Sequence, residues 1–481
     1  MKKVSKKVKF LAAVLGSLLI SSSAFAVDLT LDNSAVKRAT AGQFSTDSDK
    51  VNAKDIFDLE RSFFSAGYLG SWNGGNPGVD ANGTPITSGN GTATAKGLNN
   101  GIQGSFGVAL PAGMYLGIAA AYNLKDTANI TTDKEGNTGT AINRYTIGST
   151  GNFMAALRIN DMIAVHYNLR LGDDANSTIL YKVDHTKNKT ANNDYKTYTH
   201  QAHWNHELAA AVKFGEHKLT IPVSVDVYAN NVKNKGKEAG VDINNATYNN
   251  GPDYVKLNIN PEFFLSLPVG PMTGINMGLD FGVGLNNNVG KNGTFYEQDT
   301  TGTGTGTYVK NEYKTTEKAL RMNVGVWASF PMEWSLANDQ VSLAMEPQIK
   351  LDFDVNNFGE YKQTKNGVVV EATHDKSKNN SLLITPYAEL PIGTLWRPVE
   401  WYELRFGTAL VIGSYITLAG GEDGNGQKIA DTTTYETYSG IAGFFGMGFI
   451  VGEDFNVDLY AEVAKLNFFS MDFGGQLTYR F

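Results

Sequence analysis

The end of the chain alternates between apolar and polar positions. Residues 471–481 read MDFGGQLTYRF, and the apolar side chains fall on every second position, with a glycine at 475: Met471, Phe473, Leu477, Tyr479 and Phe481. Successive side chains of a β-strand point to opposite faces, so this spacing predicts a strand with one apolar and one polar face. A strand of this kind separates two different media.

The beginning of the chain has the parts of a secretory signal peptide. Five lysines lie within the first nine residues, an apolar stretch covers residues 10–20, and Ala24 and Ala26 form an A-x-A cleavage site. The apolar stretch is much shorter than the ~20 residues that cross a membrane as a helix. We therefore expect residues 1–26 to be a signal peptide that is removed on export.

Charge and cysteine content narrow the partners. The chain has a formal charge of −7, and removing the five lysines of the signal peptide leaves −12. An exported protein this acidic is not expected to bind nucleic acid. The chain has no cysteine, so its stability owes nothing to disulfides.

Alternating segments recur along the chain. The clearest runs from Val341 to Val355, with apolar residues at the odd positions and four charged residues among the even ones. It is more than twice the usual length of about five or six residues for a strand in a soluble protein. The same pattern occurs at 219–228, 275–286, 320–330 and 455–464.

The connections between these segments alternate between short and long. We place short turns at 111–113, 160–161, 215–217, 268–271, 331–339, 393–400 and 452–454. Long polar loops are expected at about 73–98, 126–140, 173–197, 231–252, 287–316, 356–379 and 418–435. With no apolar segment long enough for a helix, only a closed barrel would leave no backbone group unpaired in lipid. The number of alternating segments and connections predicts an all-β, antiparallel, up-and-down transmembrane β-barrel over residues 61–481. It has about sixteen strands, with 14 or 18 as alternatives.

These features resemble bacterial outer-membrane β-barrels. Their assembly machinery reads a terminal aromatic-x-aromatic signal, which Tyr479 and Phe481 match, although the usual glycine stands one place early, at Gly475. The resemblance implies outer-membrane lipids and the barrel assembly machinery as partners. It also implies periplasmic short turns, extracellular long loops and, as in many porins, a homotrimer as one arrangement. The third outer loop of porins narrows the pore, and either 173–197 or 287–316 could take that role here.

Residues 27–60 do not follow the strand pattern. They are polar and mixed in character, and 55–64 has some helical character. Two interpretations stay open: a periplasmic tail, or a plug that folds into the lumen.

The polar faces of the expected strands carry charges of both signs, which a packed core would not contain. The inward positions singled out as pore-lining are Arg170, Asp226, Glu262, Asp280, Arg321, Glu346, Lys350, Asp352, Arg405 and Arg480. Rings of charge on a pore wall set ion selectivity, and acids outnumber bases over the whole inward set. We therefore expect a weak preference for cations.

Catalytic and metal-binding patterns are sparse. His200, His203 and His206 have a spacing that could bind a metal, but on a strand His203 points away from the other two. They are read mainly as interfacial histidines, with metal capture by a loop as the alternative. No nucleophile motif is recognisable, so neither an enzyme nor a cofactor is expected.

Three functions fit the pattern. The leading hypothesis is a porin-like channel for passive diffusion of small hydrophilic solutes or ions. The second is a surface adhesin or antigen anchored by its barrel. The third is a plugged transporter of hydrophobic compounds, resembling long-chain fatty-acid transporters, with residues 27–60 as the hatch.

Overall fold

The computed structural model describes most of the chain beyond residue 34. The described ranges are 35–73, 92–94, 98–131, 135–137, 139–172, 179–238, 240–242, 246–249, 253–287, 292–298, 308–373, 380–422, 428–452, 454–464 and 470–481. Both residues of the expected signal-peptide cleavage site, Ala24 and Ala26, lie outside them.

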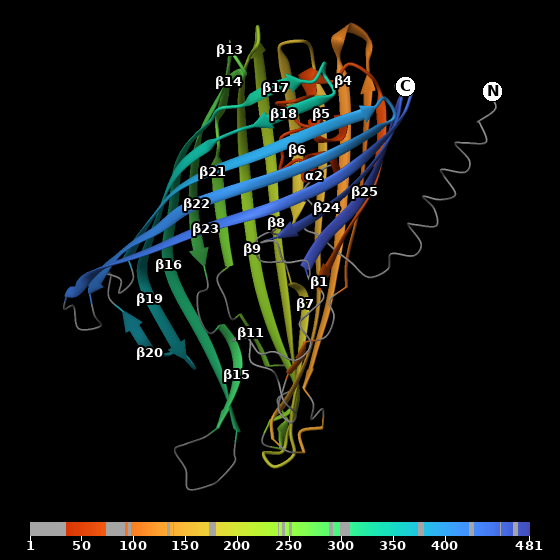
Figure 1. Ribbon diagram of the computed structural model, residues 1–481. Coiled ribbons are helices and arrows are strands. Elements are labelled where there is room, and N and C mark those ends of the chain that lie inside the picture. The colour runs from red at the N-terminus through yellow and green to blue at the C-terminus, as the bar shows by residue number, and fades with distance from the viewer. Residues whose placement is uncertain are drawn as a thin grey trace.

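The described chain folds into one antiparallel sheet that closes on itself (Figure 1). Its first half consists of β1 (Phe63–Asn73), β3 (Leu98–Ala109), β4 (Tyr115–Thr131), β5 (Ala141–Arg158), β6 (Ile163–Leu171) continued by β7 (Ile179–Asn188), β8 (Asn193–Phe214), β9 (His217–Glu238), and β12 (Asp253–Ile259) continued by β13 (Glu262–Val269). Its second half consists of β14 (Met272–Asn287), β16 (Tyr308–Ser329) continued by β17 (Met332–Leu336), β18 (Val341–Met345) continued by β19 (Gln348–Lys365), β21 (Asn380–Val399), β22 (Tyr402–Glu422), β23 (Lys428–Val451), β24 (Phe455–Ala464) and β25 (Ser470–Arg480).

The continued strands each occupy one position in the wall, because both parts pair with a common neighbour. Thus β6 and β7 both pair with β5 and β8, and β12 and β13 both pair with β9 and β14. The wall therefore has sixteen strand positions, which confirms the predicted number. It closes where β1 pairs with β25, from Phe63 opposite Arg480 to Asn73 opposite Ser470. Closure leaves no sheet edge exposed to lipid.

One end of the barrel carries short turns and the other carries long ribbons (Figure 1). The turns join β8 to β9 and β13 to β14 through Gly215 and Gly270, both of which have a positive φ that glycine adopts without strain. At the other end, strands such as β8, β9 and β16 reach 22 residues. A tilted strand needs only ~9–11 residues to cross a bilayer, so these strands extend beyond it.

Parts of the expected outer loops belong to the wall instead. Within 173–197, β7 pairs with both β5 and β8, and within 287–316, β15 (Asn292–Gln298) pairs with β16. The expectation that one of these loops folds inward to narrow the pore is therefore wrong for their described residues. The remaining short strands also extend the wall at this end: β2 (Thr92–Thr94), β10 (Val241–Asp242), β11 (Ala246–Asn249) and β20 (Val368–Thr373).

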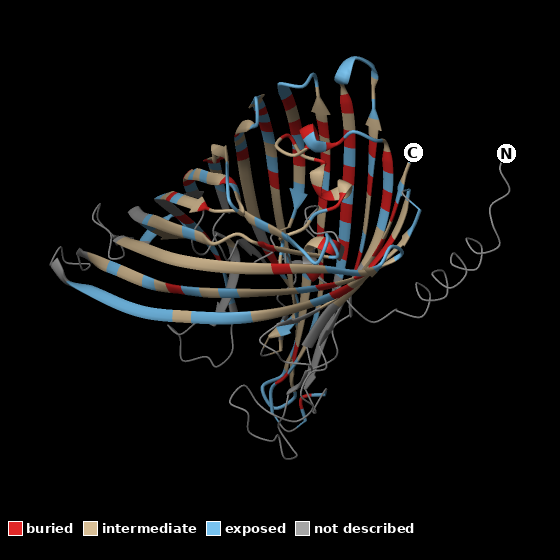
Figure 2. Ribbon diagram, turned by 45° about the horizontal axis from the view of Figure 1, so that its top comes forward, coloured by how far each residue is buried: buried red, intermediate tan, exposed pale blue. Residues whose placement is uncertain are grey.

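The outward face of the wall is apolar. Large aliphatic side chains such as Ile102, Leu208, Ile349 and Ile412 are more than half exposed. Figure 2 shows buried and exposed residues alternating along the strands on one side of the barrel. Apolar surface this extensive is unfavourable in water and suits contact with lipid.

The residues before the barrel lie inside it. Residues 35–62, hereafter the N-terminal segment, contain α2 (Ala35–Ala39) and two short 3-10 turns, η1 (Asp47–Lys50) and η2 (Ile56–Asp58). They lie within the lumen at the short-turn end, where Figure 2 shows a group of buried residues. Among the described residues, no helix is long and apolar enough to cross a membrane.

Candidate functional site

Strand alternation brings polar side chains into the lumen. On β8, Asn205 and Ala209 are buried, whereas Leu208 between them is exposed on the outer face. On β25, Gln476 and Thr478 are buried, as the alternation of the terminal strand predicted. The apolar band and the polar lining therefore follow from the same period of two.

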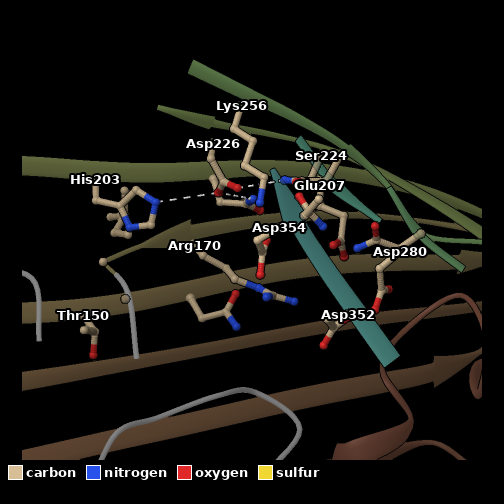
Figure 3. A pocket seen from close by; sticks show the side chains of 18 of the residues that line it. Thr150, Arg170, His203, Glu207, Ser224, Asp226, Lys256, Asp280, Asp352 and Asp354 are labelled. Carbon is tan, nitrogen blue, oxygen red and sulfur yellow. Dashed lines mark hydrogen bonds and ion pairs between the residues drawn. The ribbon is translucent and has the colours of Figure 1, made fainter. Parts of the chain in front are cut away.

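A cavity of about 560 Å³ lies in the lumen against eight neighbouring strand positions, β5 to β19. Figure 3 shows the side chains of most of its lining residues. It is lined by Thr150, Gly151, Asn152, Arg170, Leu171, Gly172, His203, Asn205, Glu207, Ser224, Asp226, Lys256, Asn258, Asn260, Asp280, Asn323, Lys350, Asp352 and Asp354.

The strand register places five polar lining residues in a continuous row. Asn152 on β5 lies opposite Arg170 on β6, which lies opposite Asn205 on β8. Asn205 lies opposite Asp226 on β9, which in turn lies opposite Lys256 on β12. Neighbouring strands are ~4.8 Å apart, so the row spans roughly 19 Å of the wall.

Asp226 is held by its neighbours within this row. Its carboxylate accepts hydrogen bonds from Asn205 Nδ2 at 2.5 Å and from Asn258 Nδ2 at 2.8 Å. His203 Nε2 lies 3.7 Å from the same carboxylate (Figure 3). These contacts engage both carboxylate oxygens of Asp226 and fix the side chain against the wall.

A second charged group lies on β14, β16 and β19. Lys350 Nζ is 2.8 Å from Asp280 Oδ2 and 3.2 Å from Asp352 Oδ1. Gly325 lies directly opposite both aspartates, and a Cβ there would collide with the Asp352 carboxylate. Glycine at this position lets one ammonium bridge two carboxylates, and the group keeps one net negative charge.

Glu207 connects the cavity to the N-terminal segment through a histidine. His166 Nδ1 accepts a hydrogen bond of 2.9 Å from the backbone N–H of Ala53. The proton of this ring is therefore on Nε2, which donates to Glu207 Oε1 at 2.9 Å.

Five of the ten predicted pore-lining residues meet in the cavity. They come from β6, β9, β14 and β19, and are Arg170, Asp226, Asp280, Lys350 and Asp352. Two further predicted residues contact the N-terminal segment: Glu262 forms an ion pair with Lys54, and Arg480 forms one with Asp47.

The other three predicted residues lie elsewhere in the wall. Arg405 is buried, with Nε 2.6 Å from Glu403 Oε1 and Nη2 2.7 Å from Asp458 Oδ1. Glu346 accepts hydrogen bonds from two neighbouring polar side chains. Arg321 is exposed on β16 and does not line the cavity.

The N-terminal segment packs against a surface of small residues on the inner wall. Ile56, Phe57 and Leu59 belong to one buried cluster with alanines of β4, β5, β6 and β8, namely Ala119, Ala121, Ala156, Ala164, Ala209 and Ala211. Near the start of the segment, α2 lies so close to β23 that a Cβ at Gly446 would collide with Ala39. The small wall residues therefore leave room for the segment.

Polar contacts hold the same segment to several strands. The Arg158 guanidinium at the end of β5 donates to the carbonyls of Ile56, Phe57 and Leu59 at 3.3, 3.1 and 2.9 Å. Lys218 Nζ on β9 is 2.8 Å from Asp58 Oδ2. These contacts, with the ion pairs to β13 and β25, reach around much of the barrel.

The ion pair of Lys54 with Glu262 keeps a charge within the lumen. Burial alone would lower the pKa of Lys54, but the carboxylates of Glu262 and Asp55 outweigh it, so its pKa is raised. The ammonium form is thus the one that the surroundings favour.

The alanines are functional residues that the sequence analysis missed. They stand at inward positions of otherwise polar or mixed faces, within alanine-rich stretches such as GIAAAYN from residue 117 and LAAAV from residue 208. Small apolar residues where a water-filled lumen would place polar ones could have indicated a packed internal segment.

The three histidines of β8 do not converge. His203 lines the cavity, whereas His206 lies on the outer face with Nδ1 2.8 Å from the Tyr167 hydroxyl. Within the described ranges, no group of histidine, cysteine and acidic residues is arranged to hold a metal ion.

The closed wall, apolar outside and polar inside, gives the chain the architecture of bacterial outer-membrane β-barrels. No family model and no curated protein matches the sequence. Solved structures with some similarity include the toluene transporter TodX of P. putida, at 8% identity and a TM-score of 0.38, covering 94% of this chain and 99% of that one.

Two other solved structures show a similar level of likeness. The copper transporter OprC has 8% identity and a TM-score of 0.37, with 87% of this chain and 80% of that one covered. A mutant of the ferric enterobactin receptor PfeA from Pseudomonas aeruginosa has 8% identity and a TM-score of 0.33, with 94% and 89% covered. These scores are low, so the fold assignment rests on the strand pairing of this chain.

Proposed function

We propose that this protein is an outer-membrane channel through which small hydrophilic solutes and ions diffuse, with a weak preference for cations and without catalysis. Residues 1–26 direct its export, and the apolar outer band contacts membrane lipid. The aromatic rings of Tyr479 and Phe481, stacked with centroids 6.0 Å apart, form the signal for the assembly machinery.

The polar cavity is the observation that carries this proposal. Of the described residues that line it, Leu171 alone has a large apolar side chain. Burying a hydrophobic solute against amides and carboxylates would desolvate them without new hydrogen bonds, at a cost of roughly 1–3 kcal/mol for each group. A hydrated or hydrogen-bonding solute avoids that cost.

The charges of the lining favour cations. Five carboxylates line the cavity, against Arg170, Lys256 and Lys350, so the formal excess is two negative charges with His203 neutral. Charge on a pore wall raises the local concentration of the opposite ion and excludes the like one. Because much of this charge is paired, the preference is weak.

The N-terminal segment supports a second candidate, the plugged transporter of hydrophobic compounds. Its position in the lumen is what a plug requires, and its packing is extensive. The cavity that it adjoins, however, is polar. We therefore favour hydrophilic solutes and assign to the segment the role of narrowing the short-turn end.

Conductance measurements test the channel directly. The mature chain, residues 27–481, is reconstituted into planar bilayers and current is recorded in a KCl gradient. Discrete steps with a reversal potential on the potassium side are expected. Reversal at the chloride potential would exclude a preference for cations. If a demonstrably folded barrel carries no current, the plugged transporter or the adhesin becomes the favoured function.

A further inference from the structure

The charged residues of the cavity fall into two groups. Asp226 and Glu207 are hydrogen-bonded to neighbours, and Lys350 bridges two aspartates. In contrast, Arg170, Lys256 and Asp354 form no hydrogen bond or ion pair with any other described residue, although Arg170 lies within electrostatic range of the Glu207 carboxylate. Charged groups whose hydrogen-bonding atoms are not held by a neighbour can bind a ligand in the cavity.

The two unpaired cations belong to the same row of the wall. Arg170 and Lys256 are separated by β8 and β9, with Asn205 and Asp226 between them. Figure 3 shows Arg170 extending into the cavity from β6. A carboxylate entering the cavity would therefore meet a planar guanidinium that can bind it through two hydrogen bonds.

The unpaired anion comes from the other wall of the cavity. Asp354 is on β19, two residues from Asp352 on the same luminal face. The bridge of Lys350 with Asp280 and Asp352 adds a further net negative charge beside it. This part of the cavity suits an ammonium group.

Buried amides provide a second observation. Asn152 and Asn205 are 8% and 9% exposed, both line the cavity, and the Oδ1 atom of each has no hydrogen-bond partner within the described structure. Buried polar atoms are rarely left unsatisfied, and each such atom costs about 1–3 kcal/mol. A bound solute with N–H groups would satisfy them.

We propose that this cavity is a binding site for small zwitterions of amino-acid to short-peptide size. Arg170 and Lys256 receive the carboxylate, and Asp354 with the Lys350 group receives the ammonium. Asn152 and Asn205 accept hydrogen bonds from the N–H groups between them. The proposal rests on the channel function and specifies its solute class.

The arrangement distinguishes zwitterions from simple ions. A solute with only a carboxylate would gain the contacts of Arg170 and Lys256 but not those of Asp354, and a solute with only an ammonium would gain the reverse, so either binds less tightly than a zwitterion. A solute carrying both charges satisfies both walls. A cavity of about 560 Å³ has the size of known small-molecule sites and holds such a solute.

Four probes of similar size test this specificity. Glycylglycine carries both charges, N-acetylglycine only the carboxylate, glycylglycinamide only the ammonium, and N-acetylglycinamide neither. Uptake of each is measured in liposomes containing the mature chain. We expect glycylglycine uptake to saturate and to be competed weakly by the other three, because each of them lacks at least one charged contact. Equal, linear uptake of all four would overturn the proposal.

Matched variants test the residues. Arg170→Gln, Lys256→Gln and Asp354→Asn should each raise the half-saturating glycylglycine concentration about tenfold, the effect of losing one charge-assisted contact. Lys256→Arg keeps the positive charge and should bind glycylglycine as the unmodified chain does. Arg321→Gln, on the same barrel but outside the cavity, should leave the half-saturating concentration unchanged. Equal effects of Arg321→Gln and Arg170→Gln would also overturn the proposal.

Two further readouts separate this proposal from the channel function. Stepwise KCl conductance reports the channel without any zwitterion. Equilibrium dialysis of labelled glycylglycine against the detergent-solubilised barrel reports the site without transport. Conductance without binding would contradict the zwitterion site and leave the channel function intact. Binding without conductance would contradict the channel function and leave the binding site intact.

Discussion

The ammonium of Lys54 forms an ion pair with the carboxylate of Glu262, which ties the N-terminal segment to β13. The same segment packs Ala39 against Gly446 of β23, on a different side of the lumen. A segment fixed to several parts of the wall cannot leave the lumen without breaking these contacts together. Its displacement is therefore a discrete event that can be blocked or promoted.

A disulfide should lock the segment in place. A Cβ at Gly117 would lie 3.5 Å from Val51 Cβ, which falls within the range for disulfides, and the chain has no other cysteine. In the double variant Val51→Cys/Gly117→Cys, oxidation is expected to reduce the single-channel conductance, and a reductant should restore it. Unchanged conductance after confirmed oxidation would mean that solutes pass beside a fixed segment.

Breaking the Lys54 ion pair should loosen the segment. Glu262→Gln leaves the ammonium without its partner in a partly exposed site, a loss on the order of 1 kcal/mol after screening by solvent. We expect faster hydrogen exchange over residues 50–60 and more frequent conductance steps. The exchanged pair Lys54→Glu/Glu262→Lys should recover protection. Lack of recovery would indicate that the two residues act separately.

The architecture could be predicted from the sequence because its cause is local. Alternation with period two places Leu477 and Tyr479 on one face and Gln476 and Thr478 on the other, whatever the strand pairs with. Turns such as the one at Gly215 and an even number of strands then give the topology. The extent of the strands was less predictable, since polar strands that rise above the membrane, such as β7, look like loops.

The candidate site was only half predictable. Alternation says that Arg170 and Lys350 face inward, but not that Arg480 meets Asp47 or that Arg405 is enclosed by acids. The first outcome depends on the path of the N-terminal segment through the lumen, and the second depends on how β22, β23 and β24 pair in the wall, so both are long-range contacts. The inward alanines, such as Ala209, indicate where the segment packs, because they are apolar at positions that would be polar if they faced water.

Filling the small-residue surface should displace the segment. Ala209 is fully enclosed, and Ala209→Leu adds side-chain volume where the N-terminal segment packs, at a cost of typically ~1–3 kcal/mol. The expected result is a larger conductance and greater cleavage of the segment by added protease. Leu208→Ala, one residue away on the outer face, is the control and should alter neither. Identical behaviour of the two variants would argue against an alanine surface that receives the segment.

The bridging lysine should limit cation selectivity. Lys350→Gln removes the positive charge between Asp280 and Asp352 and changes the formal excess in the cavity from two to three negative charges. Potassium should then be favoured more strongly, because the cavity wall attracts cations more and excludes chloride better. The reversal potential in a KCl gradient measures this shift, which should shrink at high salt as the charges are screened. Arg321→Gln removes the same charge outside the cavity and should shift the potential less. A larger shift in Arg321→Gln would place the selective region nearer β16 at the ribbon end of the barrel than at this cavity.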